Sequence, residues 1–199
     1  MTARSSQFEL RRRDIARRIV ERHPDALYVT GLGATTWDLA ASGRDVVSFP
    51  LWGAMGGAAA MGLGLALAQP DRRVIVITGD GEQLMGLGAL ATIGHQAPAN
   101  LAVVVFDNES YGETGMQPTH TAGLTDLAVM ADGAGFPLVL KATDDPSFSA
   151  ILPSLGDETG PVFAQIKIRA EVLPFALPEK DGAVMKDRFR AALGLGTDV

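Results

Sequence analysis

The chain has 199 residues and a formal net charge of −6, from 17 basic and 23 acidic side chains. This acidic balance argues against a nucleic-acid binder, which would carry a basic surface. The chain has no cysteine, which excludes disulfide bonds and thiolate metal ligands and fits a cytoplasmic protein. A hydrophobic fraction of 47% is enough to bury one core, and the length suits one domain.

Two segments bear on targeting and membranes. Met1–His23 is charged and lacks an apolar core, so we expect no signal peptide there. Val46–Pro70 carries no charge over 25 residues, which is long enough to span a bilayer. Because Pro50 interrupts this segment and Gly and Ala dominate it, we expect a buried strand, a loop and a helix and no membrane span.

The first predicted element is an amphipathic helix over Ser6–Arg22, followed by alternating strands and helices. Its run of arginines could bind phosphate, but we favour a solvated helix face; the run comprises Arg11, Arg12, Arg13, Arg17 and Arg18. Short β-branched runs predict buried parallel strands at Ala26–Thr30, Asp45–Phe49, Val74–Thr78, Leu101–Phe106, Leu138–Ala142 and Val162–Ile168. Helices are expected at Thr36–Ala41, in the Gly/Ala-rich stretch ending near Ala68, and at Glu82–Gly94, Thr125–Ala134, Pro146–Leu155 and Ala183–Leu193.

This alternation predicts an α/β fold: one doubly wound, mostly parallel sheet with helices on both faces. We assign residues 1–170 to that domain and residues 171–199 to a C-terminal tail with a short helix. The sequence shows no internal repeat, no long linker and no second core.

Polar side chains follow the two central predicted strands at the points where they end. Gly79, Asp80 and Gly81 follow one strand, and Asn108 follows the next. In an open parallel sheet, ligands bind at the carboxyl edge, so Asp80 and Asn108 are expected to lie there together. Carboxylate and amide oxygens suit Mg²⁺, which keeps positions for phosphate oxygens, and Gly81 has no side chain to block an anion. The sequence therefore predicts a metal-bridged diphosphate site.

A family resemblance rests on this spacing. G-D-G, then 26 residues, then Asn108 in F-D-N-E-S-Y-G resembles the thiamine diphosphate motif of the thiamine-dependent enzymes. The resemblance implies bound thiamine diphosphate, with Mg²⁺ held by Asp80, Asn108 and the carbonyl of Ser110. It departs from the family at Asp107, where the usual residue is Asn. The further cofactor-binding residues that it implies are Thr30, Gly31, Gly79, Gly81, Glu82 (through its backbone N–H) and Tyr111. The plain alternative is a parallel-sheet protein with an acidic loop and an Asn-containing turn.

The segment P-L-W-G-A-M-G-G resembles another part of that family. By this resemblance, the carbonyl of Gly53 binds the aminopyrimidine amine, and Met55 wedges under the cofactor and bends it. Without the downstream motif, Met55 would be ordinary core filling.

The stretches G-A-L-A-T-I-G-H-Q-A-P-A-N-L and D-N-E-S-Y-G-E-T-G-M-Q-P-T resemble phosphonopyruvate decarboxylase and the β subunit of sulfopyruvate decarboxylase. This implies decarboxylation of a small anionic 2-oxo acid to an aldehyde. It also implies a hetero-oligomer, because the activating Glu lies in a separate pyrimidine-binding domain, here an α subunit. Two departures leave the substrate's anionic head open: G-A-M-G-G replaces G-S-M-G-H, and T-G-L-G-A-T-T replaces T-G-M-T-S.

The polar loop Tyr111–Thr121 is placed beside the metal site and could meet a substrate. Its His120 is our candidate catalytic residue, because an imidazole can titrate near neutral pH; a surface role is the equal alternative. Two other functions stay open for the chain: a thiamine-dependent carboligase or oxidoreductase component, and a non-catalytic flavodoxin-like binding module.

Overall fold

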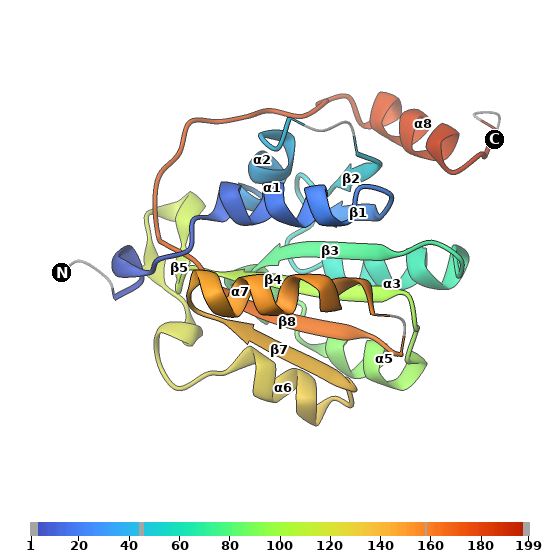
Figure 1. Cartoon of the computed structure of the whole chain (residues 1–199). Coiled ribbons are helices and arrows are strands. Elements are labelled where there is room, and N and C mark those ends of the chain that lie inside the picture. The colour runs from blue at the N-terminus through green and yellow to red at the C-terminus, as the bar shows by residue number, and fades with distance from the viewer. Residues whose placement is uncertain (1–3, 44–45, 158, 197–199) are drawn as a thin grey trace.

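The structure is a computed structural model that describes residues 4–43, 46–157 and 159–196. It confirms the predicted doubly wound α/β fold. A six-stranded parallel sheet runs in the order β2-β1-β3-β4-β8-β7 (Figure 1). Its strands are β1 (Leu27–Thr30), β2 (Ser48–Pro50), β3 (Val74–Gly79), β4 (Leu101–Asp107), β7 (Leu138–Ala142) and β8 (Val162–Lys167).

Helices cover both faces of the sheet because the central strands are apolar on both sides. One buried cluster joins alternate strand residues such as Ile75 and Val104 to the helices α1 (Arg12–Arg22), α2 (Ala34–Ala40) and α7 (Asp145–Ile151). The other joins Val76 and Val103 to α3 (Ala58–Ala68), α5 (Gly88–Gln96) and α6 (Leu127–Gly133). The remaining short turns of helix are α4 (Asp80–Met85), η1 (Arg4–Gln7), η2 (Gly112–Thr114), η3 (His120–Ala122) and η4 (Leu152–Gly156).

The order of the strands places a crevice between β1 and β3. From β1 the chain goes outward to β2 and then returns to the other side of β1 as β3. Ligands of open α/β sheets bind at the carboxyl ends of the strands at such a reversal. The register of β3 on β4 pairs Gly79 with Phe106, so Asp80 and Asp107 leave the sheet side by side. The loops after β1, β3 and β4 therefore meet at one rim.

The expectation of one helix over Glu82–Gly94 is wrong, because α4 ends at Met85 and α5 begins at Gly88. The break has a tertiary cause. Gly86 lies against the backbone of Gly56, and a Cβ atom at position 86 would collide with the Gly56 carbonyl oxygen. This approach ties the end of α4 to the loop that precedes α3.

The N-terminal helix also differs from the prediction. The α-helix begins only at Arg12, after the separate turn η1. The solvated face expected for the arginines is correct for Arg11 and Arg17 but wrong for Arg12, which is 7% exposed and paired with Asp38. A buried guanidinium needs such a partner because an isolated charge is costly away from water.

The C-terminal tail crosses the molecule. It leaves β8, passes over the end of the sheet and reaches the opposite edge, where α8 (Gly182–Ala192) lies beside β2 (Figure 1). The rings of Phe49 and Phe189 meet edge to face, 5.5 Å apart. Part of the strand expected at Asp45–Phe49 lies outside the described residues, and β2 extends to Pro50. None of the helices in residues 4–43, 46–157 and 159–196 has the length and hydrophobicity that a transmembrane helix requires.

Candidate functional site

A cavity of about 140 Å³ opens at the rim where the loops after β1, β3 and β4 meet. It brings together eight of the residues predicted to bind the cofactor or metal, namely Met55, Gly79, Asp80, Gly81, Glu82, Asn108, Ser110 and Tyr111. The other lining residues come mainly from α1, from α2 with the loop before it, and from the segment 112–114. The sequence motif and the crevice predicted by the strand order thus coincide.

Asp80 is a buried carboxylate held by two hydroxyl groups. The Thr119 hydroxyl donates a hydrogen bond to its Oδ2, and the Thr121 hydroxyl lies 3.0 Å from the same oxygen and shares its single proton between Asp80 and Asp107. Burial raises the pKa of Asp80 to about 6, the charge of Asp107 adds to that, and the threonine hydrogen bonds lower it in part. Both hydroxyl groups contact Oδ2, so neither of them occupies the other carboxylate oxygen of Asp80.

Asp107 lies fully buried behind Asp80. Its Oδ1 accepts hydrogen bonds from the Thr121 hydroxyl at 2.8 Å and from the Glu109 amide at 3.0 Å. Its Oδ2 accepts from the Gln165 side chain at 2.6 Å and pairs with Lys167 at 2.8 Å. Sequence reasoning gave Asp107 no role and missed Thr121, Gln165 and Lys167, since no local signal connects residues so far apart in the chain.

A tight turn carries the Asn108 side chain. Asn108 Oδ1 accepts the Ser110 N–H at 3.0 Å, and Glu109 adopts a left-handed φ of 58°. The Glu109 carboxylate is 3% exposed and binds Arg4 and Lys167. Burial pushes the pKa of Glu109 up, but these two cations hold it below its ordinary value. The segment Tyr111–Thr121, expected as a loop, contains a small antiparallel ribbon of β5 (Ser110–Tyr111) and β6 (Gln117–Pro118).

Glu82 joins the loop after β1 to the turn after β3. Its Oε2 accepts hydrogen bonds from the Leu32 amide at 3.1 Å and the Thr78 hydroxyl at 2.9 Å. Its Oε1 is buried without a hydrogen-bond partner. Burial raises the pKa of Glu82, and the hydroxyl and nearby amides offset part of that rise. A Cβ atom at Gly31 would collide with this carboxylate, so the contact requires glycine there.

Four of the predicted residues lie away from the cavity lining. Gly53 is exposed, and the side of Gly31 that would carry a Cβ atom faces the Glu82 carboxylate. The Thr30 hydroxyl is buried at 2.8 Å from the Thr36 hydroxyl. His120 is exposed at the start of η3. Their roles toward a cofactor or substrate remain predictions.

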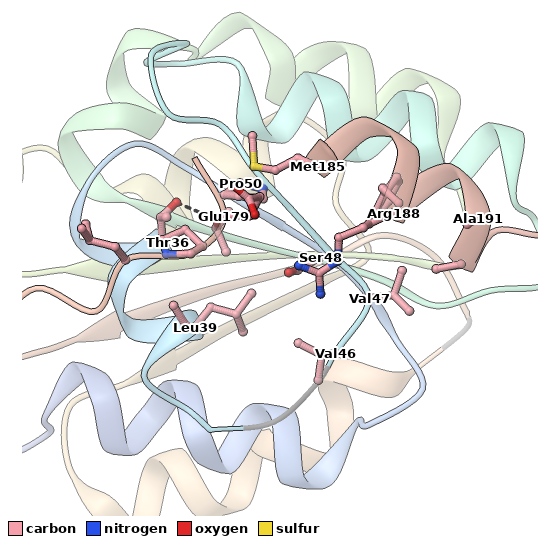
Figure 2. A pocket seen from close by; sticks show the side chains of 16 residues that line it. Thr36, Leu39, Val46, Val47, Ser48, Pro50, Glu179, Met185, Arg188 and Ala191 are labelled. Atoms are coloured by element: carbon pink, nitrogen blue, oxygen red, sulfur yellow. Dashed lines mark hydrogen bonds between the residues drawn. The ribbon is translucent and has the colours of Figure 1, made fainter. Parts of the chain in front are cut away.

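A larger cavity of about 610 Å³ lies between β2, α2 and the C-terminal tail. Figure 2 shows Val46 and Val47 with Leu39 along one side and Met185, Arg188 and Ala191 of α8 along the other. Of the predicted site residues it is lined only by Thr30 among those that the structure describes. Most of the predicted site residues therefore converge in the smaller cavity.

The smaller cavity suits a metal-bound diphosphate. A carboxylate at Asp80, an amide oxygen at Asn108 and a main-chain carbonyl form the kind of donor set that Mg²⁺ takes together with phosphate oxygens. The side of Gly79 that would carry a Cβ atom faces open space. The expectation that Gly81 leaves room for the anion is wrong, because a Cβ atom there would collide with the Tyr111 ring. The described part of the chain has no cluster of three or more His, Cys, Asp or Glu side chains able to hold a metal, so an ion here would depend on this mixed set.

Comparison with known proteins identifies the family of the chain. The family model for the thiamine pyrophosphate enzyme, C-terminal TPP binding domain, matches residues 31–182. Sulfopyruvate decarboxylase subunit beta of Methanothermobacter thermautotrophicus is 37% identical over 165 residues, which cover 83% of this chain and 85% of that one. The same subunit of Methanocaldococcus jannaschii is 43% identical over 126 residues, 63% of this chain and 66% of that one. Phosphonopyruvate decarboxylase of Streptomyces viridochromogenes is 36% identical over 178 residues, 89% of this chain but 44% of that protein.

Proposed function

Because the chain belongs to the thiamine pyrophosphate enzymes, as a C-terminal TPP-binding domain, we propose that it is the diphosphate-binding subunit of a two-subunit decarboxylase. Its substrate would be a small anionic 2-oxo acid resembling phosphonopyruvate or sulfopyruvate, and its products CO₂ and an aldehyde. The observation that carries this proposal is the shared cavity of Asp80 and Asn108 at the ends of adjacent strands. Similarity to both types of decarboxylase over most of the chain supports the substrate class.

The partner in this proposal is a separate α subunit that contributes a pyrimidine-binding domain and the activating Glu. The shares of two relatives that this chain covers support such a partner. The chain matches a relative named as a β subunit over 85% of that subunit, but it spans only 44% of the phosphonopyruvate decarboxylase. A second chain would supply what the rest of that longer enzyme contains. The cofactor would then lie between the two subunits, with its diphosphate on this one.

The predicted site residues have the following tasks in this proposal. Bound thiamine diphosphate would supply the electron sink for the electron pair left when CO₂ departs. Asp80, Asn108 and the Ser110 carbonyl would hold Mg²⁺ against the diphosphate, and the bare Cα of Gly79 would leave room for it. The Gly53 carbonyl would accept a hydrogen bond from the pyrimidine amine, and Met55 would support the bent cofactor. His120 would donate or accept a proton at the substrate.

The test is CO₂ release by the complex of this chain with its α subunit. We expect Mg²⁺-dependent release from phosphonopyruvate or sulfopyruvate within a panel of 2-oxo acids. Asp80→Ala should reduce it at least a hundredfold because the metal loses its carboxylate, whereas the exposed control Asp71→Ala should retain it. No release from any acid in the panel, or full activity of Asp80→Ala, would refute the proposal. Products with a new carbon–carbon bond would instead identify a carboligase.

A further inference from the structure

Arg12 is a buried cation that lines the same cavity as Asp80 and Asn108. It is the first residue of α1, and its side chain is 8% exposed. Its Nη1 lies 3.3 Å from Asp38 Oδ2, but its Nε is buried without a hydrogen-bond partner. Leaving a buried donor unpaired is costly, so this guanidinium group is expected to gain an acceptor when the cavity is filled.

Asp38 does not neutralise the arginines around it. The carboxylate is fully buried and is shared by Arg12 and Arg13, each at 3.3 Å. Burial raises the pKa of Asp38 to about 6, and the two arginines lower it in part. Two guanidinium groups against one carboxylate leave an excess of one positive charge at this wall.

The rest of the cavity is acidic. Besides Asp38, its lining contains the carboxylates of Asp80, Glu82 and Glu113, and Arg12 is the one basic side chain among the described residues that line it. An oxyanion entering this cavity therefore needs a metal ion at Asp80 and the positive charge of Arg12 to offset these carboxylates. The proposed function involves two anions, the diphosphate of the cofactor and the anionic head of the substrate. The residues proposed to bind the metal line the same cavity as Arg12 and would hold the diphosphate there.

We propose that Arg12 binds the diphosphate of the cofactor through its guanidinium group. This inference rests on the proposed function only for the identity of the cofactor. It assigns a role to the one arginine of the N-terminal run that turns away from solvent. The substrate's anionic head offers similar oxygens, so the experiment must separate the two sources.

The decisive comparison is between Asp38→Asn and the double variant Arg12→Gln/Asp38→Asn. Both carry the same amide in place of the Asp38 carboxylate and differ only in Arg12, and the double variant leaves no buried carboxylate unpaired. Magnesium thiamine diphosphate and magnesium pyrophosphate would be titrated into the full chain by calorimetry, with thiamine monophosphate as the ligand of lower charge. Arg17→Gln is the control, because Arg17 sits on the exposed side of the same helix, paired with Asp14 and Glu21.

We expect Asp38→Asn to bind both diphosphates severalfold more tightly than the wild type. The double variant should bind them about tenfold to a hundredfold more weakly than Asp38→Asn, with a reduced preference for diphosphate over monophosphate. Arg17→Gln should match the wild type, and melting temperatures would confirm that the variants fold.

Equal affinity of the single variant Asp38→Asn and the double variant, or no binding of either diphosphate by the wild type, would overturn the inference. It would also be overturned if these two variants differed only in the KM for the 2-oxo acid, since Arg12 would then hold the substrate's head. A wild-type complex that binds cofactor but releases no CO₂ would refute the proposed function alone, because this test is read from binding.

Discussion

Lys167 Nζ lies 2.8 Å from Asp107 Oδ2, at a carboxylate with no exposure to solvent. The same nitrogen reaches Glu109 at 2.8 Å, so one cation serves two buried carboxylates on either side of Asn108. Through Asp107 this pairing extends to the Thr121 hydroxyl and on to Asp80. The proposed metal ligands are thus positioned by a charge that comes from β8, two strands away from β3.

Replacing Lys167 alone should lower the stability of the fold, and neutralising its partner Asp107 as well should recover much of that stability. We expect Lys167→Met to destabilise the chain by about 3–5 kcal/mol, because a buried carboxylate loses its cation. Asp107→Asn/Lys167→Met removes Lys167 and one of its two carboxylates, while the other, Glu109, keeps Arg4, so it should be more stable than the single variant. Urea unfolding measures both. A double variant no more stable than Lys167→Met would show that the charge balance is not the cause.

Asp80→Asn should stabilise the ligand-free chain at neutral pH while abolishing metal-dependent cofactor binding. The folded-state pKa of Asp80 is raised from 3.8 to about 6, mainly by burial, so the folded state binds its proton more tightly. The cost of ionising Asp80 is absent below pH 3.8 and fully present above about 6, where it is on the order of 2–3 kcal/mol.

The advantage of Asp80→Asn over the wild type in unfolding free energy should therefore grow as the pH rises from about 4 to 6. It should then stay level to pH 8. Matched unfolding curves at pH 4.5, 5.5 and 7 would check this. An advantage that does not change with pH would mean that the ionisation of Asp80 is not involved.

Gly31→Ala should be strongly destabilising, because its new methyl group meets the Glu82 carboxylate. The contact is specific to that pair, so Gly31→Ala/Glu82→Ala should recover a large part of the loss. A double-mutant cycle on melting temperature measures this coupling. If the effects of the two substitutions on melting temperature were additive, the destabilisation by Gly31→Ala would not come from its contact with Glu82.

Gly86→Ala should weaken cofactor binding through the loop that carries Gly53 and Met55. The added Cβ would push on the Gly56 carbonyl and displace that loop. Gly64→Ala, on α3 with open space around it, is the control and should stabilise the chain by roughly 0.5–1 kcal/mol through helix propensity. Cofactor titrations and melting temperatures of both variants would be compared, and a Gly86→Ala chain that binds like Gly64→Ala would refute the coupling.

The strands and the core of the site could be predicted because their signals are local. A buried parallel strand such as β4 is a short apolar run, and a polar residue directly after it must lie at the rim. The position of Asp80 and Asn108 at the rim could therefore be predicted from the sequence, and their role as metal ligands stays a prediction. Lys167, Thr121 and the burial of Arg12 could not be, because each depends on contacts with residues far away in the chain. The break after Met85 was missed for the same reason: it depends on Gly56.

The helix α8 beside β2 has a consequence for how the protein behaves in solution. The outermost strand of an open sheet carries unpaired main-chain groups that invite edge-to-edge aggregation, and short length, proline and a covering element all discourage it. β2 has three residues, ends in Pro50 and has α8 packed beside it through Phe189. A truncated chain without α8 would keep every residue of the proposed metal site, but the β2 edge of the sheet would be uncovered. Poor yield or precipitation of such a version should not be taken as damage to its chemistry.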